Sequence, residues 1–158
     1  MSEMNDKPGH LARRFQQIAV AAFHAEVGAV GSDLTPVQYA ALAEIAARPG
    51  MDQATLAGRI ALDRATITGV IDRLEKKTFL SREVKDEDRR ARVLRITEEG
   101  LRVLDVIEPA VDAAQKAMLA GLSGAEAAEF MRLLAKAIAA ANDLSRAPLR
   151  GPATETAE

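Results

Sequence analysis

Residues Asp63–Thr97 read DRATITGVIDRLEKKTFLSREVKDEDRRARVLRIT and predict a helix followed by a two-stranded hairpin. Asp63 is a favourable helix N-cap, because its carboxylate accepts hydrogen bonds from free backbone N–H groups. An apolar stripe at helical spacing follows and ends before Lys77: Ile67, Val70, Ile71 and Leu74. The residues off this stripe include arginines and threonines, so the opposite face of the helix is polar and basic.

The hairpin pattern begins directly after this helix. Leu80, Arg82 and Val84 alternate in a first strand, the charged segment KDEDRR forms a polar turn, and Val93–Ile96 form a second strand. A polar, arginine-bearing helix beside a basic hairpin fits a DNA duplex. The helix fits the major groove, and a hairpin arginine lies against the backbone or in the minor groove.

The charge of this region supports a polyanionic partner. Residues 59–95 carry eleven Lys or Arg and seven Asp or Glu, a net charge of +4 in a chain whose net charge is −2. The rest of the chain therefore carries −6, and such asymmetry indicates that one face binds a polyanion. The alternative is a charged, solvated helix and hairpin with no partner, because charge runs are often only solvated.

Composition excludes several other classes of protein. A chain of 158 residues suits one domain. It has no cysteine, which excludes disulfides and thiolate metal sites. No apolar run is long enough to span a membrane and the N-terminus lacks an apolar signal core, so we expect a cytoplasmic protein with no membrane partner.

An enzyme is not expected either. Catalysis needs a base, nucleophile or metal within reach of one another. The two histidines, His10 and His24, lie fourteen positions apart on one predicted helix, about 21 Å along its axis, which is too far for one metal ion. No metalloprotease, hydrolase, phosphate-loop or dinucleotide motif occurs. We therefore expect no metal site and no cofactor.

The remaining chain reads as helices with clear start signals. A helix is predicted from Pro8 to about residue 30, and Thr35-Pro36-Val37-Gln38 contains a capping box that starts a second helix, ended by Pro49-Gly50. Asp52 caps a short helix that ends near residue 60. Its turn into the Asp63 helix has helix-turn-helix proportions.

The C-terminal half predicts two further helices. Thr97 caps a long helix to about residue 121, which Pro109 should bend or locally break. Ser123 opens a capping box for a last helix to about residue 144. That helix is expected to turn these side chains inward: Phe130, Leu133, Leu134, Ala137, Ile138 and Ala141. Residues 1–7 are expected to be flexible, and residues 147–158 a disordered tail.

Three adjacent segments, in order, resemble the MarR family of winged-helix transcription regulators: LTPVQYAALAEIA, LAGRIALDRATITGVIDRLEKKTFLSRE and DEDRRARVLRITEEGLRVL. The similarity covers roughly residues 8–145. The opening PGHLARRFQQIAVAAF further resembles a branch that responds to aromatic acids, with hydroxynicotinate-responsive repressors as the nearest match.

This resemblance implies a mainly α fold with a small β wing, a winged helix-turn-helix joined to a helical dimerisation platform. It predicts one domain over residues 8–146. The dimerisation helices would lie at about 8–30 and 98–145, and the winged helix-turn-helix at about 35–97. The Ala- and Leu-rich terminal helices are consistent with a homodimer, although they could also pack only within one chain. A symmetric dimer would place two recognition helices about 34 Å apart on a pseudopalindromic operator.

The resemblance also assigns DNA-binding roles. Arg64, near the start of the recognition helix, would make a bidentate contact to guanine. Arg90 would enter the minor groove, oriented by Asp88 of the family's Asp-x-Arg signature. The other candidates for phosphate or thymine-methyl contacts are Thr66, Thr68, Arg73, Arg89 and Arg92. Any one of these arginines could instead be an ordinary surface residue.

A small aromatic carboxylate is the effector that the resemblance implies, in a pocket lined by the first, second and fifth helices. His10 and Arg14 share one face of the first helix and could pair a carboxylate, and Tyr39 could add a hydroxyl. The alternative is that His10 and Arg14 are surface or dimer contacts and Tyr39 is core. We therefore expect a transcriptional repressor that binds double-stranded DNA and is released from it by this ligand. The competing hypothesis is an architectural or protein-interaction module without an effector.

Overall fold

The computed structural model describes residues 4–85 and 88–151, and for residues 85 and 88–91 the backbone only. The elements in chain order are η1 (Met4–Asp6), α1 (Pro8–Ala29), α2 (Pro36–Ala47), α3 (Gln53–Arg59), α4 (Arg64–Lys76), β1 (Leu80–Lys85), β2 (Asp88–Ile96), α5 (Glu98–Met118), α6 (Gly124–Ala141) and η2 (Asn142–Leu144). The predicted class, mainly helical with one small antiparallel hairpin, is confirmed.

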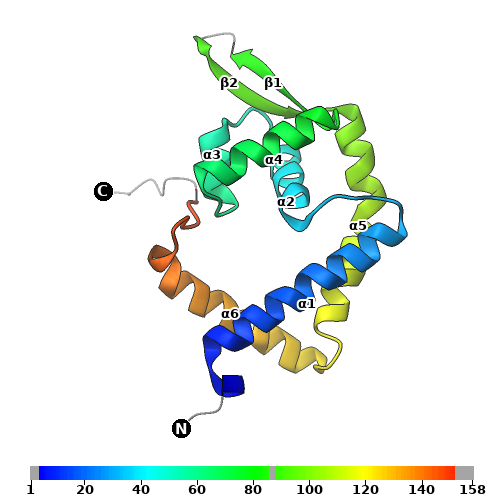
Figure 1. The fold of residues 1–158 in the computed structure, drawn as a ribbon, viewed down its shortest axis with the longest axis vertical. Helices are drawn as coiled ribbons and strands as arrows, with labels where there is room; N and C mark the ends of the chain where they lie inside the picture. The colour runs from blue at the N-terminus through cyan, green and yellow to red at the C-terminus, as the bar shows by residue number, and fades with distance from the viewer. Residues whose placement is uncertain (1–3, 86–87, 152–158) are drawn as a thin grey trace.

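Figure 1 shows two parts of the molecule. The first, which we call the winged lobe, comprises α2, α3, α4 and the β1–β2 hairpin. The second, the platform, comprises α1, α5 and α6. α5 extends from the hairpin end of the winged lobe into the platform, where α1 packs along it. One helix therefore belongs to both parts.

The helix starts follow the capping chemistry expected from the sequence. Thr35 and Gln38 form the predicted capping box of α2, and Asp52 and Asp63 accept hydrogen bonds from the third residue of α3 and α4. The turn between α3 and α4 contains Ala61 in a left-handed conformation, with φ of 53°. These caps hold the two short helices in helix-turn-helix geometry.

The hairpin is longer than its sequence pattern suggested. β1 and β2 pair antiparallel from Leu80 opposite Ile96 to Val84 opposite Arg92, and the register shifts beyond Val84. β2 already begins at Asp88, a position predicted to lie in the turn. Alternation places Leu80 in the core.

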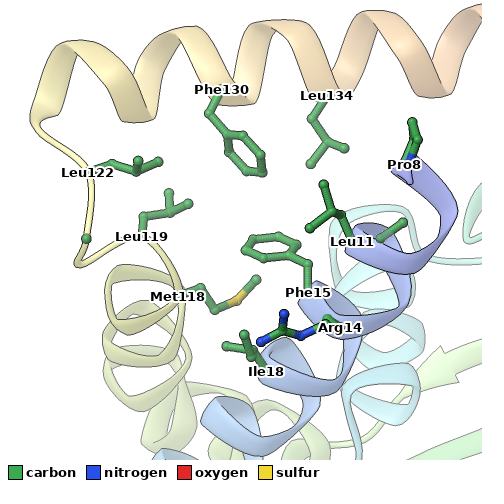
Figure 2. A pocket seen from close by; sticks show the side chains of 12 residues that line it. Pro8, Leu11, Arg14, Phe15, Ile18, Met118, Leu119, Leu122, Phe130 and Leu134 are labelled. Atoms are coloured by element: carbon green, nitrogen blue, oxygen red, sulfur yellow. The ribbon is translucent and has the colours of Figure 1, made fainter. Parts of the chain in front are cut away.

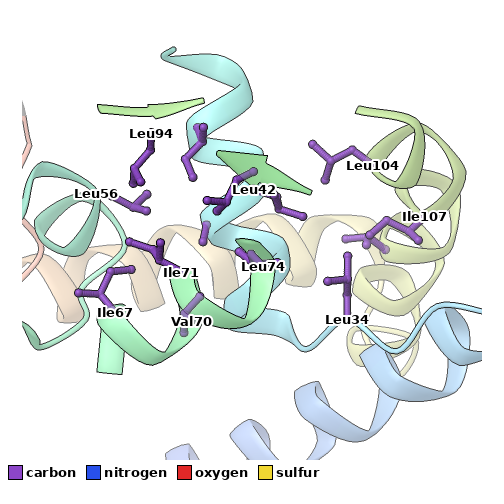
Figure 3. Packing of buried hydrophobic residues seen from close by; sticks show 14 of the residues in the cluster. Leu34, Leu42, Leu56, Ile67, Val70, Ile71, Leu74, Leu94, Leu104 and Ile107 are labelled. Carbon is purple, nitrogen blue, oxygen red and sulfur yellow. The ribbon is translucent and has the colours of Figure 1, made fainter. Parts of the chain in front are cut away.

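The core lies inside the winged lobe and continues under α1 and α5 (Figure 3). The predicted stripe of α4 is confirmed, since Ile67, Val70, Ile71 and Leu74 are all buried. Each fully buried side chain of this size contributes about 1.5–3 kcal/mol relative to an exposed one. The same core cluster includes Leu34, Leu42, Ile45, Leu56, Leu80, Leu94, Leu104 and Ile107. The apolar face of α4 is thus packed into the core, and its polar face is left to solvent.

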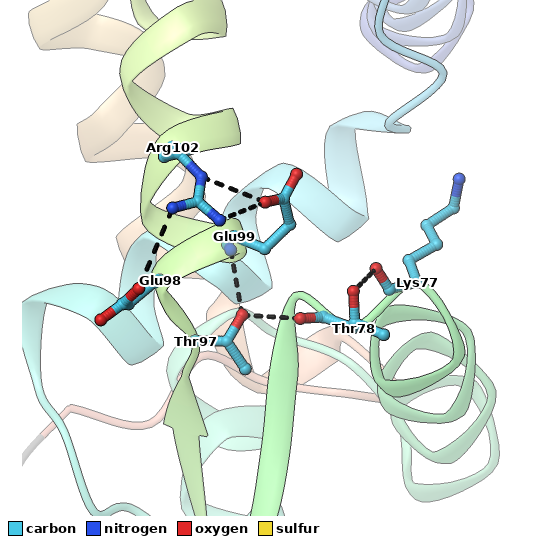
Figure 4. A network of polar contacts seen from close by, with 7 residues as sticks. Lys77, Thr78, Thr97, Glu98, Glu99 and Arg102 are labelled. Carbon is cyan, nitrogen blue, oxygen red and sulfur yellow. Dashed lines mark hydrogen bonds and ion pairs between the residues drawn. The ribbon is translucent and has the colours of Figure 1, made fainter.

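The junction of the hairpin with α5 is a close backbone packing (Figure 4). The hydroxyl of Thr97 accepts from the N–H of Gly100 at 3.0 Å and donates to the carbonyl of Thr78 at 2.6 Å. A Cβ on Gly100 would lie 2.1 Å from the carbonyl oxygen of Phe79. Position 100 therefore requires glycine, and α5 begins in direct contact with the backbone of Phe79, between α4 and β1.

The two C-terminal helices depart from expectation. α5 is continuous through Pro109, so the predicted local break is wrong. Pro109 and Asp105, whose carbonyl loses its helical donor, are both exposed, and water can satisfy that carbonyl. No residue of α6 is buried, and Leu133 and Ile138 are 48% and 57% exposed. The expectation that α6 turns its apolar residues inward is wrong for a single chain, because α6 has too little of this chain to pack against.

The chain ends also differ from expectation. Residues 4–6 form the short helix η1 within the segment expected to be flexible. Residues 147–151 lie in the predicted disordered tail, yet they pack against the chain, and the N–H of Arg150 donates to the carbonyl of Gly58 at 2.8 Å. Residues 1–3 and 152–158 lie outside the described residues, so those parts of the prediction stay untested.

Candidate nucleic-acid interface and effector pocket

The exposed face of α4 carries four of the candidate DNA-binding residues. Arg64, Thr66, Thr68 and Arg73 are all exposed, opposite or beside the buried stripe. Among the described residues, neither Arg64 nor Arg73 pairs its guanidinium with a hydrogen-bond or ion-pair partner. Both cations are therefore available to an external anion or base.

The two threonines are already engaged. The Thr66 hydroxyl donates to the Asp63 carboxylate at 2.9 Å, and the Thr68 hydroxyl donates to the carbonyl of Arg64 at 2.9 Å. The Thr68 oxygen also accepts from the side-chain amide of Gln53 at 2.7 Å. To donate to a phosphate either hydroxyl would have to give up an internal bond, so the methyl groups are the better contacts, for example with thymine.

Arg82 on β1 contributes to the charge of this surface, a role that the sequence pattern did not identify. Its guanidinium pairs with Asp72 at 2.5 Å and with Glu75, both on α4. The hydrogen bond that Arg82 donates to the Asp72 carboxylate raises the pKa of Arg82, against an opposing effect of burial. Asp72 is exposed on α4, and Arg82 offsets its negative charge there. The alternation that puts Arg82 on the same strand face as buried Leu80 was the available signal.

The wing carries the remaining DNA-binding candidates. Arg92 on β2 is exposed. The backbone of β2 includes Asp88, Arg89 and Arg90, whose side chains lie outside the described residues, and the roles assigned to them stay predictions. Nearer the base of the hairpin, Arg95 pairs with Glu83 on the neighbouring strand at 2.5 Å. This ion pair holds the guanidinium of Arg95 against the neighbouring strand.

The candidate effector site is a cavity of about 660 Å³ at the far end of the platform (Figure 2). The side chains around it come from the start of α1, the end of α5 and the start of α6, and most are apolar: Pro8, Leu11, Ala12, Phe15, Ile18, Met118, Leu119, Leu122, Phe130 and Leu134. Phe15 and Phe130 meet edge to face across it, with ring centroids 5.3 Å apart. Arg14 is the one charged residue in this lining.

One of the three predicted ligand residues lines this cavity. Arg14 lines the cavity, whereas His10 and Tyr39 do not. Nδ1 of His10 lies 3.5 Å from the guanidinium of Arg13. This cavity lies between α1, α5 and α6, and the pocket between the first, second and fifth helices stays a prediction. Helical spacing predicted the shared face of His10 and Arg14 but could not show which neighbour each would meet.

Tyr39 occupies a different contact, between α2 and the platform. Its ring packs against Phe23 of α1, with centroids 5.9 Å apart, and its hydroxyl donates to the carboxylate of Glu108 on α5. Burial raises the pKa of Tyr39 to about 12, and the charge of Glu108 acts in the same direction. Tyr39 therefore connects the winged lobe to the platform.

Other kinds of site find little support in the described part of the chain. No group of three or more His, Asp or Glu side chains there is arranged to hold a metal ion. No helix there combines the length and apolarity that a bilayer crossing requires.

Comparison with known proteins agrees with this geometry. The MarR family model matches residues 34–91, from the start of the winged lobe into the hairpin. The transcriptional regulator HosA of Escherichia coli is 32% identical over 133 residues, which are 84% of this chain and 96% of HosA.

Two solved structures share the whole fold. The PcaV transcriptional regulator from Streptomyces coelicolor, in complex with its natural ligand, is 35% identical and superposes with a TM-score of 0.80, over 89% of this chain and 98% of PcaV. BpsR of Bordetella bronchiseptica, whose DNA binding is regulated by 6-hydroxynicotinic acid, is 27% identical with a TM-score of 0.80, over 86% and 96% of the two chains. The chain belongs to the MarR family of DNA-binding transcriptional regulators.

Proposed function

We propose that this protein is a homodimeric repressor that binds a pseudopalindromic DNA operator and is released by a small aromatic carboxylate. The observation that carries the DNA-binding part is α4, which buries its whole apolar stripe and leaves Arg64 and Arg73 exposed and unpaired among the described residues. A rigid helix with free guanidinium groups suits the major groove, where arginine binds guanine in bidentate geometry.

The exposed apolar faces of the platform support the homodimer. Met131, Leu133 and Ile138 of α6 are 51%, 48% and 57% exposed and lie outside the cavity lining, and α6 buries none of its residues. An exposed apolar surface of this kind on one chain typically marks an interface. A second copy covering α1 and α6 would bury it and would set the spacing of the two recognition helices, about 34 Å for adjacent major grooves.

The cavity beside Arg14 supports the effector part. An apolar cavity with one guanidinium suits a flat ring that carries a carboxylate, because the ring is buried against Phe15 and Phe130 while the charge pairs with Arg14. The regulation of BpsR by 6-hydroxynicotinic acid and the ligand complex of PcaV are consistent with this class of effector.

The position of the cavity suggests how binding would act on DNA. The cavity lies at the end of α5 farthest from the hairpin, while the start of α5 is fixed to the winged lobe through Thr97 and Gly100 (Figures 2 and 4). A ligand that changes the packing of α1, α5 and α6 alters the orientation of both winged lobes. Two half-sites at fixed spacing tolerate little such change.

The test begins with a duplex selected by the wild-type protein from a random pool. Aromatic carboxylates, including hydroxynicotinates and hydroxybenzoates, are then titrated by calorimetry with and without that duplex. A coupling of about 1–3 kcal/mol gives about 5–150-fold weaker DNA binding, and the duplex must weaken ligand binding by the same factor.

The matched variants are Arg14→Ala and Arg13→Ala, neighbours on α1 of which only Arg14 lines the cavity. We expect Arg14→Ala to lose carboxylate binding and Arg13→Ala to keep it, with both remaining dimeric by sedimentation. Selection of no sequence by the wild-type protein rejects a sequence-specific regulator. Ligand affinity that is unchanged by the duplex rejects derepression.

A further inference from the structure

The chain after α6 turns back towards the winged lobe (Figure 1). The side chain of Asn142 closes this turn, since its oxygen accepts from the N–H of Leu149 at 2.8 Å and its amide donates to the carbonyl of Leu149 at 3.2 Å. The N–H of Arg150 then donates to the carbonyl of Gly58 on α3 at 2.8 Å. Residues 145–151, which we call the C-terminal segment, are thus attached to the helix-turn-helix.

A cleft of about 600 Å³ lies between the C-terminal segment and the helix-turn-helix. Arg64 from α4 and Arg146 and Arg150 from the segment line it. The acidic residue in this lining is Asp63, whose carboxylate already accepts from the N–H and hydroxyl of Thr66 at 2.8 and 2.9 Å. The cleft therefore presents three arginines and one occupied carboxylate.

The position of this cleft points to the DNA backbone. In a helix-turn-helix the second helix enters the major groove by its N-terminal residues, and the first helix crosses the sugar–phosphate backbone. The C-terminal segment packs on that first helix, α3, and beside Arg64 at the start of α4. Its arginines therefore lie at the level of the phosphates that flank the recognition helix.

We propose that the C-terminal segment is part of the DNA-binding surface, and that Arg146 and Arg150 bind backbone phosphates beside Arg64. The proposal rests on the proposed DNA-binding function and adds to it a contact outside the winged lobe. In a dimer the two C-terminal segments together supply four arginines in addition to those of the winged lobes.

The composition of the segment favours contact with DNA over shielding of Arg64. Its residues, SRAPLRG, include two arginines and no acid, so none of them competes with DNA for Arg64. Arg64, Arg146 and Arg150 are all exposed, and solvent reaches each of them. The segment therefore adds positive charge to the helix-turn-helix without covering its recognition residue.

The first test compares Arg146→Ala/Arg150→Ala with Lys116→Gln/Lys136→Gln, which removes the same charge from exposed positions on α5 and α6. Affinity is measured for the selected duplex and for an unrelated duplex over a range of salt concentrations. The arginine variant should bind both duplexes more weakly by a similar factor, about tenfold or more, with a salt slope smaller by about 0.9 for each phosphate that it no longer neutralises. The lysine variant should keep the wild-type slope.

A second variant keeps both arginines and moves the segment. A Cβ on Gly58 would lie 3.1 Å from Cβ of Arg150, and the three atoms nearest to it would all belong to the Arg150 side chain. Gly58→Gln should therefore displace the segment from α3 and reproduce the reduced affinity and slope, with an unchanged melting temperature.

Wild-type affinity and salt slope in Arg146→Ala/Arg150→Ala would overturn the proposal. A loss of affinity confined to the selected duplex would also overturn it, because phosphate contacts carry no base sequence information. Failure of the proposed function is a separate result, seen when the wild-type protein itself selects no duplex.

Discussion

The hydroxyl of Tyr39 on α2 lies 3.1 and 3.2 Å from the two carboxylate oxygens of Glu108 on α5, and it donates to this carboxylate. The two residues are 69 positions apart, and their contact joins the winged lobe to the platform. Tyr39 is the only tyrosine in a chain without tryptophan, so its ionisation can be followed directly by phenolate absorbance.

We expect Tyr39 to titrate near pH 12 in the folded protein and near pH 10 when unfolded. Burial and the charge of Glu108 both disfavour the phenolate, and Glu108→Gln should bring the folded midpoint down towards 10. Because the unfolded chain releases this proton first, the free energy of unfolding should fall between about pH 10 and 12. In Tyr39→Phe the part of this decrease in the free energy of unfolding that comes from Tyr39 should be absent. A folded midpoint near 10 would contradict the buried contact.

Arg64→Ala should relax specificity at one base position in each half-site. A bidentate contact between arginine and guanine contributes about 1–3 kcal/mol of discrimination against the wrong base. The measurement is a mismatch scan of the selected duplex. Arg73→Ala is the control, expected to weaken all duplexes alike through a phosphate contact. A uniform loss of affinity in Arg64→Ala would mean that Arg64 also binds only phosphate.

Arg90→Ala should abolish tight operator binding and leave the melting temperature of the dimer unchanged. Arg90 lies near the tip of the hairpin, and the expected contact is of its guanidinium with a narrow minor groove. Mobility-shift titration against the selected duplex measures the change in affinity. Affinity within about twofold of wild type would show that Arg90 makes no minor-groove contact that matters for binding.

Gly100→Ala should lower the free energy of unfolding by about 1–3 kcal/mol, because the added Cβ collides with the backbone carbonyl of Phe79. Gly69→Ala is a matched control within a helix, since nothing lies within 4 Å of its added Cβ. That change should be neutral or stabilise by up to about 1 kcal/mol. Urea unfolding of the three proteins gives the comparison, and equal stability of the two variants would contradict the close packing of α5.

Ile138→Glu should shift the protein from dimer to monomer, because Ile138 is 57% exposed on the apolar face of α6 that a second copy would cover. Lys136→Glu places the same side chain on the charged face and should leave the dimer intact. Sedimentation velocity over a range of concentrations distinguishes the two. A dimer that tolerates Ile138→Glu would place the interface elsewhere.

Local chemistry was predictable from the sequence. Thr35, Asp52, Asp63, Thr97 and Ser123 all cap the helices they were predicted to start, because a cap involves only three or four consecutive residues. The stripe on α4 was also predictable, because its spacing alone defines a buried face.

Contacts between distant segments were not predictable in the same way. The pairing of Arg82 with Asp72, the bond between Arg150 and Gly58, and the separation of Tyr39 from Arg14 depend on how elements pack. The exposure of α6 could not be predicted for the same reason, because it depends on which elements pack against α6. Helical spacing identifies an apolar face, but it does not say whether the same chain or another one covers it.

The unbroken course of α5 makes it a lever. Its 21 residues extend about 31 Å, with the fixed start at Thr97 and Gly100 at one end and the cavity residues after Met118 at the other. A tilt of about 5° in a rod of this length moves the far end by about 3 Å. Because the start of α5 is fixed to the winged lobe, a ligand that tilted α5 by this angle about its cavity end would move the winged lobe by about 3 Å, the length of a hydrogen bond.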